Sequence, residues 1–193
     1  MSGSKVKIQK LILQAQRGDS DAVSTIYQTY IDRIYRYIVY RVGSESDAED
    51  LTAEVFVNMV EGLSRYKDTG APFESWLYRI ASARVADFYR KREKQPLAEL
   101  PENMVDSELL PEEQMLEQQE ISELQKALGQ LKEDEQQVLI LRFVERKSHR
   151  VVAEILDKQV SAIKNIQYRA LTKLSTLLGS EKKPRHYLRG DDD

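Results

Sequence analysis

The stretch HRVVAEILDKQVSAIKNIQYRALTKLSTLL, residues 149–178, decides the fold of the carboxyl-terminal half of the chain. Its apolar residues recur at helical spacing on either side of the triplet DKQ, residues 157–159. This pattern predicts a short helix over residues 149–156, a tight turn, and a longer helix over residues 161–178 that Ser161 caps. Two helices joined in this way form a helix-turn-helix, a geometry that places the second helix in the major groove of DNA.

The longer helix has an apolar side and a polar, basic side. On the polar side, towards the amino-terminal end, lie Lys164, Asn165, Gln167, Tyr168 and Arg169. Lysine and arginine bind phosphate or guanine, and amide side chains bind the edge of adenine. The residues therefore suit DNA binding, although a packed pair of helices with a solvated basic face has the same pattern.

Upstream of this motif, helical periodicity extends over residues 115–131 and 133–144. The segment before it, residues 93–114, places three prolines among acidic residues. Proline-rich sequence of high charge is typical of an extended linker. The last residues, 179–193, are expected to form a disordered tail.

The amino-terminal half is predicted to be helical as well. Apolar spacing indicates a helix over residues 22–41 that ends near Gly43, a second that Ser46 or Asp47 caps and that runs to residue 63, and a third over residues 74–92. No strand-like alternation interrupts them. We therefore expect an all-α fold of two small helical domains joined by an extended acidic linker, with the helix-turn-helix in the second domain.

The third of these helices combines basic and aromatic side chains. Its candidate surface residues are Tyr78, Arg79, Arg84, Tyr89, Arg90, Lys91 and Arg92. Aromatic rings stack on unpaired bases while guanidinium groups hold the backbone, so this helix suits single-stranded DNA. The loop before it, residues 66–73, is a candidate pocket for an extruded base. Ordinary core packing is the alternative, and it is favoured for Trp76 and Phe88.

The helix before that loop is acidic, with Asp47, Asp50 and Glu54 along one face. Such a face suits docking of a basic partner helix, or it is an ordinary solvated surface. A carboxylate-bridged metal site in a helical bundle normally also uses histidines from facing helices. The two histidines, His149 and His186, lie far from these acids in the sequence, so we expect no metal site.

Composition and charge exclude several classes of protein. The chain has no cysteine, which rules out disulfides, thiolate metal sites and thiol nucleophiles. Its apolar runs fall short of the roughly 20 residues that span a bilayer, and its first residues lack a signal-peptide pattern, so we expect no membrane insertion and a cytoplasmic location. No phosphate-binding loop, dinucleotide turn or catalytic triad is recognisable, so we expect neither catalysis nor a cofactor.

The formal net charge of −3 is sorted along the chain. Residues 79–94 carry a net charge of +4 and residues 142–173 carry +5, whereas residues 44–61 carry −6 and residues 93–120 carry −8. Basic segments that alternate with acidic ones indicate two contacts with a polyanion and two contacts of the opposite kind.

Taken together, these segments resemble the sigma factors of the extracytoplasmic-function (ECF) type, which bind bacterial RNA polymerase. The strings DAEDLTAEVF (47–56) and FESWLYRIA (73–81) resemble the second conserved region of that family. The strings QQVLILRFVERKSHRVVAEIL (136–156) and VSAIKNIQYRALTKL (160–174) resemble its fourth region. The resemblance implies a protein that brings core RNA polymerase to promoter DNA and promotes melting. An anti-sigma factor is a candidate further partner, which the sequence alone does not establish.

The resemblance also implies a role for each segment. Residues 1–92 correspond to the domain that binds polymerase and the minus-ten element, residues 93–114 to a linker threaded through the polymerase cleft, and residues 115–178 to the domain that binds the minus-thirty-five element. The implied polymerase-binding residues are Asp50, Leu51, Glu54, Val55 and Phe56. Those implied for the minus-ten element are Tyr66, Lys67, Phe73, Ala83, Arg84, Asp87, Arg90 and Arg92. Those implied for the minus-thirty-five element are Lys164, Asn165, Tyr168 and Arg169.

The chain departs from the family pattern at a few of these positions. Ala83 stands where the family often has asparagine, on the face that meets the melted base, and Ala53 stands where it often has glutamine. Two other classes of function compete with a sigma factor. A conventional helix-turn-helix regulator predicts tight binding to a two-fold-symmetric site without polymerase, and an enzyme predicts a catalytic motif.

Overall fold

All regular structure in the described part of the chain is helical. The computed structural model describes residues 2–94 and 123–179, and within these two ranges it contains helices but no strand. The predicted all-α class is therefore confirmed. The expected linker (93–114) and tail (179–193) lie outside the described residues, apart from their first positions.

Four helices form the amino-terminal half: α1 (Ser2–Gln16), α2 (Ser20–Val42), α3 (Glu45–Leu63) and α4 (Phe73–Lys94). The first of them, α1, forms from the amphipathic segment that precedes the predicted helices. Asp19 caps α2, because its Oδ1 accepts hydrogen bonds from the backbone N–H groups of Asp21 and Ala22 at 3.0 and 3.1 Å. At its other end α2 stops at Gly43, which has the left-handed φ of 73° that favours glycine.

The start of α3 differs from the sequence prediction. Ser44 Oγ accepts a hydrogen bond from the backbone N–H of Asp47 at 3.3 Å, so Ser44 is the N-cap, and the predicted caps Ser46 and Asp47 are wrong. Both lie inside the first turn, where the carboxylate of Asp47 stabilises the partial positive charge of the helix end.

An apolar stripe on each helix builds the core of this half. Tyr37, Val55, Met59, Leu77 and Val85 are at most 1% exposed and belong to one hydrophobic cluster. Burial of this extent stabilises the packing of α2, α3 and α4, since each fully buried side chain contributes roughly 1.5–3 kcal/mol.

The carboxyl-terminal half consists of shorter helices. Residues 123–129 are helical, and α6 (Glu133–Leu139), the π-helix η1 (Ile140–Val144), α7 (His149–Leu156) and α8 (Val160–Leu177) follow. The stretch predicted as one helix, 133–144, changes type at Ile140, whose carbonyl accepts from the N–H of Glu145 at 3.0 Å. A π-turn inserts one residue and shifts the side chains that follow.

The turn of the helix-turn-helix contains no glycine, and Asp157 takes the position that glycine often occupies. Its backbone is left-handed (φ 52°, ψ 50°), a conformation that aspartate and asparagine adopt more readily than most residues. Helix α8 then begins at Val160, with Gln159 at the N-cap and without a side-chain cap. The predicted cap at Ser161 is therefore wrong, because Ser161 already lies within the helix.

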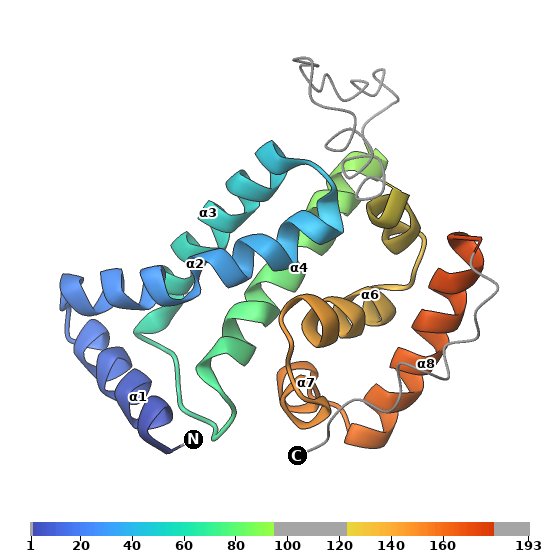
Figure 1. The fold of residues 1–193 in the computed structure, drawn as a ribbon. Coiled ribbons are helices and arrows are strands. Elements are labelled where there is room, and N and C mark those ends of the chain that lie inside the picture. The colour runs from blue at the N-terminus through green and yellow to red at the C-terminus, as the bar shows by residue number, and fades with distance from the viewer. Residues whose placement is uncertain (1, 95–122, 180–193) are drawn as a thin grey trace, which may run out of the picture.

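The two halves pack against each other. Helix α4 contacts α7, and α2 contacts η1; Figure 1 shows where α2, α4 and α7 lie in the fold. One hydrophobic cluster includes Ile34 and Leu77 of the first half together with Leu141 and Ile155 of the second. No helix in the described ranges is long and apolar enough to cross a membrane.

Candidate nucleic-acid and polymerase interfaces

Helix α8 presents the predicted DNA-binding residues on one exposed face. Lys164, Asn165, Tyr168 and Arg169 are all exposed, Tyr168 by 49%, whereas Ile163 on the opposite side is fully buried. Together with Lys158 and Gln159 from the turn, three of the four line a shallow depression at the amino-terminal end of the helix. This is the arrangement in which a recognition helix brings donors to base edges and phosphates.

Gln167 does not belong to that face, which corrects the sequence prediction. Its side chain is 1% exposed, and its Oε1 accepts from Arg142 Nε at 3.1 Å and lies 3.0 Å from His149 Nε2. These contacts join α8 to η1 and α7. Gln167 therefore helps to fix the orientation of α8 and does not lie on its exposed face.

On α3, the structure divides the predicted polymerase-binding residues into a surface pair and a core set. Asp50 and Glu54 are exposed. Leu51, Val55 and Phe56 are at most 5% exposed, so in this conformation they lie in the core beneath that surface. They hold α3 in place, and the ring of Phe56 packs edge-on against that of Tyr27 at 4.8 Å.

Exposed apolar residues that the sequence analysis missed complete this face of α3. Val57 and Val60 are 57% and 51% exposed, and Ala53 is exposed beside them. With Asp50 and Glu54 they recur at the spacing of one helical face, and this spacing in the sequence could have identified them. The result is a surface of two carboxylates next to two exposed valines, a composition that suits a protein partner.

The basic residues of α4 are partly neutralised by an acid between them. Asp87 forms ion pairs with Arg84, at 2.6 Å, and with Arg90. Arg92 lies 5.3 Å from the ring centroid of Phe88 and 3.9 Å from the carboxylate of Asp47. Ala83 is exposed on the same helix. Of the predicted aromatic residues, Tyr78 is 2% exposed and belongs to the core, whereas Tyr89 is 38% exposed.

The loop between α3 and α4 is built on an aromatic cluster. Phe73, predicted to contact DNA, is 4% exposed in this conformation and packs beneath the loop. The ring of Tyr66 packs edge-on against that of Phe73 at 5.2 Å and at a tilt against that of Trp76 at 4.9 Å. Burial raises the pKa of Tyr66, and the negative charge of Asp68 adds to this. Tyr66 thus stays a neutral hydrogen-bond donor, and Lys67 beside it is exposed.

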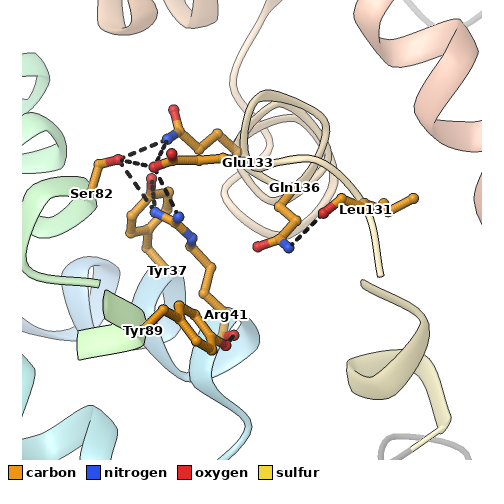
Figure 2. A network of polar contacts seen from close by, with 8 residues as sticks. Tyr37, Arg41, Ser82, Tyr89, Leu131, Glu133 and Gln136 are labelled. Atoms are coloured by element: carbon orange, nitrogen blue, oxygen red, sulfur yellow. Dashed lines mark hydrogen bonds and ion pairs between the residues drawn. The ribbon is translucent and has the colours of Figure 1, made fainter. Parts of the chain in front are cut away.

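A polar network joins the two halves of the molecule (Figure 2). Arg41, whose side chain is 3% exposed, forms an ion pair of 3.1 Å with Glu133 of α6. The same carboxylate oxygen accepts from Ser82 Oγ at 2.9 Å and from Gln137 Nε2 at 3.0 Å, so α2, α4 and α6 meet at one atom. Arg41 also donates to the hydroxyl of Tyr37 at 3.1 Å. The sequence analysis did not find this network.

Two more ion pairs link the halves, Arg36–Glu145 at 2.9 Å and Lys147–Glu74 at 2.7 Å. A cavity of about 310 Å³ lies between the two halves. It is lined from one side by α4, including Ser82 and Ala83, and from the other by residues of α6 and α7. The surface of α4 around Ala83 therefore faces the carboxyl-terminal half in this conformation.

Comparison with known proteins matches both halves. The profile of Sigma-70 region 2 matches residues 26–95, and that of Sigma-70 region 4 matches residues 121–174. The chain is 35% identical over 175 residues to the ECF RNA polymerase sigma factor BldN of Streptomyces coelicolor, covering 89% of this chain and 66% of BldN. It is 33% identical to ShbA of Streptomyces griseus and 30% identical to SigD of Mycobacterium tuberculosis, covering 88% and 87% of this chain and 94% and 82% of theirs.

The chain belongs to the ECF sigma factors. This confirms the family predicted from the sequence, and with it promoter-specific initiation by RNA polymerase as the function of the protein. Sigma factors are a family of non-enzymatic initiation factors. Among solved structures, CnrH in complex with the cytosolic domain of CnrY has the same fold, with a TM-score of 0.66 at 22% identity over 89% of this sigma factor and 97% of CnrH.

Proposed function

We propose that this sigma factor divides its work among three surfaces. The exposed face of α3, with Asp50 and Glu54, binds core polymerase. The loop after α3 and the basic part of α4 capture the unpaired minus-ten element. The exposed face of α8, with Lys164 and Arg169, reads the minus-thirty-five element as duplex.

The observation that carries this division is the separation of the exposed charges onto different helices. The four α8 residues share one exposed face on a helix whose other side is held by Gln167, and they lie in a net-positive segment. The α3 face is acidic and apolar, so it repels DNA and suits a protein. Residues 1–92 and 115–178 then form the two working domains, joined by the acidic residues 93–114.

The proposal also covers the cellular location of the protein and a further partner. We infer that it acts in the cytoplasm, where core polymerase is, and that it performs no catalysis of its own. An anti-sigma factor is a candidate partner, because a solved structure of similar fold is the sigma factor RpoE of Bartonella quintana in complex with the anti-sigma factor NepR (TM-score 0.58, 18% identity, covering 82% of this chain and 98% of RpoE).

The test is a reconstitution. Purified protein is mixed with core polymerase and supplied with genomic DNA fragments, and promoter-specific transcripts are measured. The protein alone is expected to bind duplex promoter weakly, since its basic segments are offset by acidic ones and phosphate contacts supply much of the affinity. Nanomolar, sequence-specific binding by the protein alone would instead favour a conventional helix-turn-helix regulator.

A further inference from the structure

The loop between α3 and α4 has an irregular backbone. After the turn that closes α3, in which the N–H of Tyr66 donates to the carbonyl of Leu63 at 3.1 Å, residues 67–72 belong to neither helix nor strand. The shape of such a segment depends on side chains that hold its backbone groups. For this loop one such side chain, Gln16, comes from α1, and another, Asp68, belongs to the loop and is itself bound by Gln9 of α1.

Gln16, the last residue of α1, holds the beginning of the loop. Its Nε2 donates to the carbonyl oxygens of Leu63 at 3.0 Å and of Tyr66 at 2.9 Å, and both hydrogen bonds are partly buried. A primary amide has two N–H groups, so one side chain satisfies both carbonyls at once. Gln16 thereby joins the last carbonyl of α3 to that of Tyr66, whose ring packs against Phe73 and Trp76.

Gln9, two turns earlier on the same side of α1, holds the tip of the loop. Its Nε2 donates to one carboxylate oxygen of Asp68, whose other oxygen accepts from the backbone N–H of Gly70 at 2.8 Å. Gly70 has a φ of 88°, which glycine adopts without strain. Asp68 therefore connects α1 to the turn at the loop tip.

These amides bridge a hollow. A cavity of about 280 Å³ lies between α1 and the loop, lined by Gln9, Ile12, Leu13, Gln16, Tyr66 and Asp68. Across such a gap, apolar packing contributes little, because attraction between side chains falls off steeply with separation. The amide hydrogen bonds are therefore the direct polar contacts that hold the loop against α1, in addition to the apolar cluster that Ile12 and Tyr66 share.

We propose that α1 sets the shape of the loop, with Gln16 as a positioning residue that determines which bases of the minus-ten element the protein accepts. This rests on the proposed function, in which the loop captures an unpaired base. Helix α1 ends at Gln16, before residue 26 at which the match to Sigma-70 region 2 begins. If Gln16 only closed the end of α3, its loss would affect stability and leave base preference unchanged.

The experiment compares holoenzymes that contain the wild-type protein, Gln16→Met, Gln9→Met or the control Gln14→Met. Gln14 lies on α1 and makes no described side-chain hydrogen bond to the loop. Each holoenzyme is incubated with promoter fragments randomised in both elements, and the DNA retained in open complexes is sequenced. Methionine keeps the approximate length of glutamine and removes its donors.

Gln16→Met is expected to reduce base preference within the minus-ten element by about tenfold and to leave preference within the minus-thirty-five element unchanged. The hydrogen bond of Gln9 is exposed, so Gln9→Met is expected to reduce base preference within the minus-ten element by only about threefold. Gln14→Met should match the wild type. Unchanged minus-ten preference in Gln16→Met, or an equal loss at both elements, overturns the proposal.

Two outcomes are kept apart by the design. If Gln16→Met does not fold, Gln9→Met decides, because its contact lies at the surface: reduced minus-ten preference supports the positioning role, and wild-type preference overturns it. If the wild-type holoenzyme shows no preference at either element, the proposed function itself fails. If the wild type and Gln16→Met are equally selective, by contrast, only the positioning role of Gln16 fails.

Discussion

Replacing Glu133 with glutamine removes the charge that faces the buried guanidinium of Arg41 and keeps the shape of the side chain. The Arg41 side chain is 3% exposed and that of Glu133 is 50% exposed. Breaking a fully buried ion pair lowers stability by roughly 3–5 kcal/mol, whereas an exposed pair contributes roughly 0–1 kcal/mol. Because water reaches one partner here, we expect Glu133→Gln to lower the free energy of unfolding by about 1–2 kcal/mol.

The loss falls in this range because Arg41 keeps part of its environment. Its Nη1 still donates to the Tyr37 hydroxyl at 3.1 Å, while its Nε has no hydrogen-bond partner among the described atoms. For a chain of this length, such a loss lowers the melting temperature by about 2–8 °C. Thermal unfolding followed by circular dichroism measures it directly.

The matched control is Asp134→Asn. Asp134 is also in the first turn of α6, but it pairs at 3.1 Å with the partly exposed Lys158, and its own side chain is 55% exposed. Both substitutions remove a negative charge from the same helix end, so their difference compares the contact with buried Arg41 to a more exposed ion pair. Equal melting temperatures for the two variants, or additive effects of Glu133→Gln and Arg41→Met, would refute the reasoning.

Three further outcomes are expected. Lys164→Ala or Arg169→Ala should weaken promoter binding by holoenzyme by roughly 1–3 kcal/mol where the side chain reads a base. A promoter with a pre-melted bubble should not restore this binding, and full rescue by the bubble would contradict the assignment of α8. Charge reversal at both Asp50 and Glu54 should reduce recovery of core polymerase in a pull-down at unchanged helicity, and wild-type recovery would remove α3 as the docking surface. Burial raises the pKa of the Tyr30 hydroxyl from 10.0 to about 12. The unfolded state therefore releases this proton at a lower pH than the folded state does, and the free energy of unfolding falls as the pH rises from 10 to 12. Tyr30→Phe should show a shallower alkaline decline in denaturant titrations, and an identical decline would count against that burial.

The sequence predicted the helices well because their apolar spacing and end residues are local signals. Gly43 ends α2 as expected, and the turn at Asp157 lies where the pattern breaks. Helix starts were less predictable, since several polar residues near the start of α3 are equally suited to capping. Only the structure shows that Ser44 provides the oxygen.

The candidate surfaces were predicted in part. Periodicity identifies the face of a helix but not the partners of each side chain, so Gln167 was placed with the exposed residues. It is buried by contacts with Arg142 and His149, which lie 25 and 18 residues away in the sequence. The contact between Arg41 and Glu133, 92 residues apart, has no local signal at all. Such pairings follow from tertiary packing, which a single sequence does not display.

The contact between the halves also affects what affinities mean for this protein. A ligand that needs the space beside Ala83 that α6 and α7 occupy can bind only molecules in which these helices have moved away. Its apparent affinity is therefore the intrinsic affinity multiplied by the fraction of open molecules. Weakening Arg41–Glu133 should then have effects of opposite sign, because the same substitution that lowers the melting temperature enlarges the open fraction and tightens binding. A weaker Arg41–Glu133 ion pair therefore lowers thermal stability and raises ligand affinity.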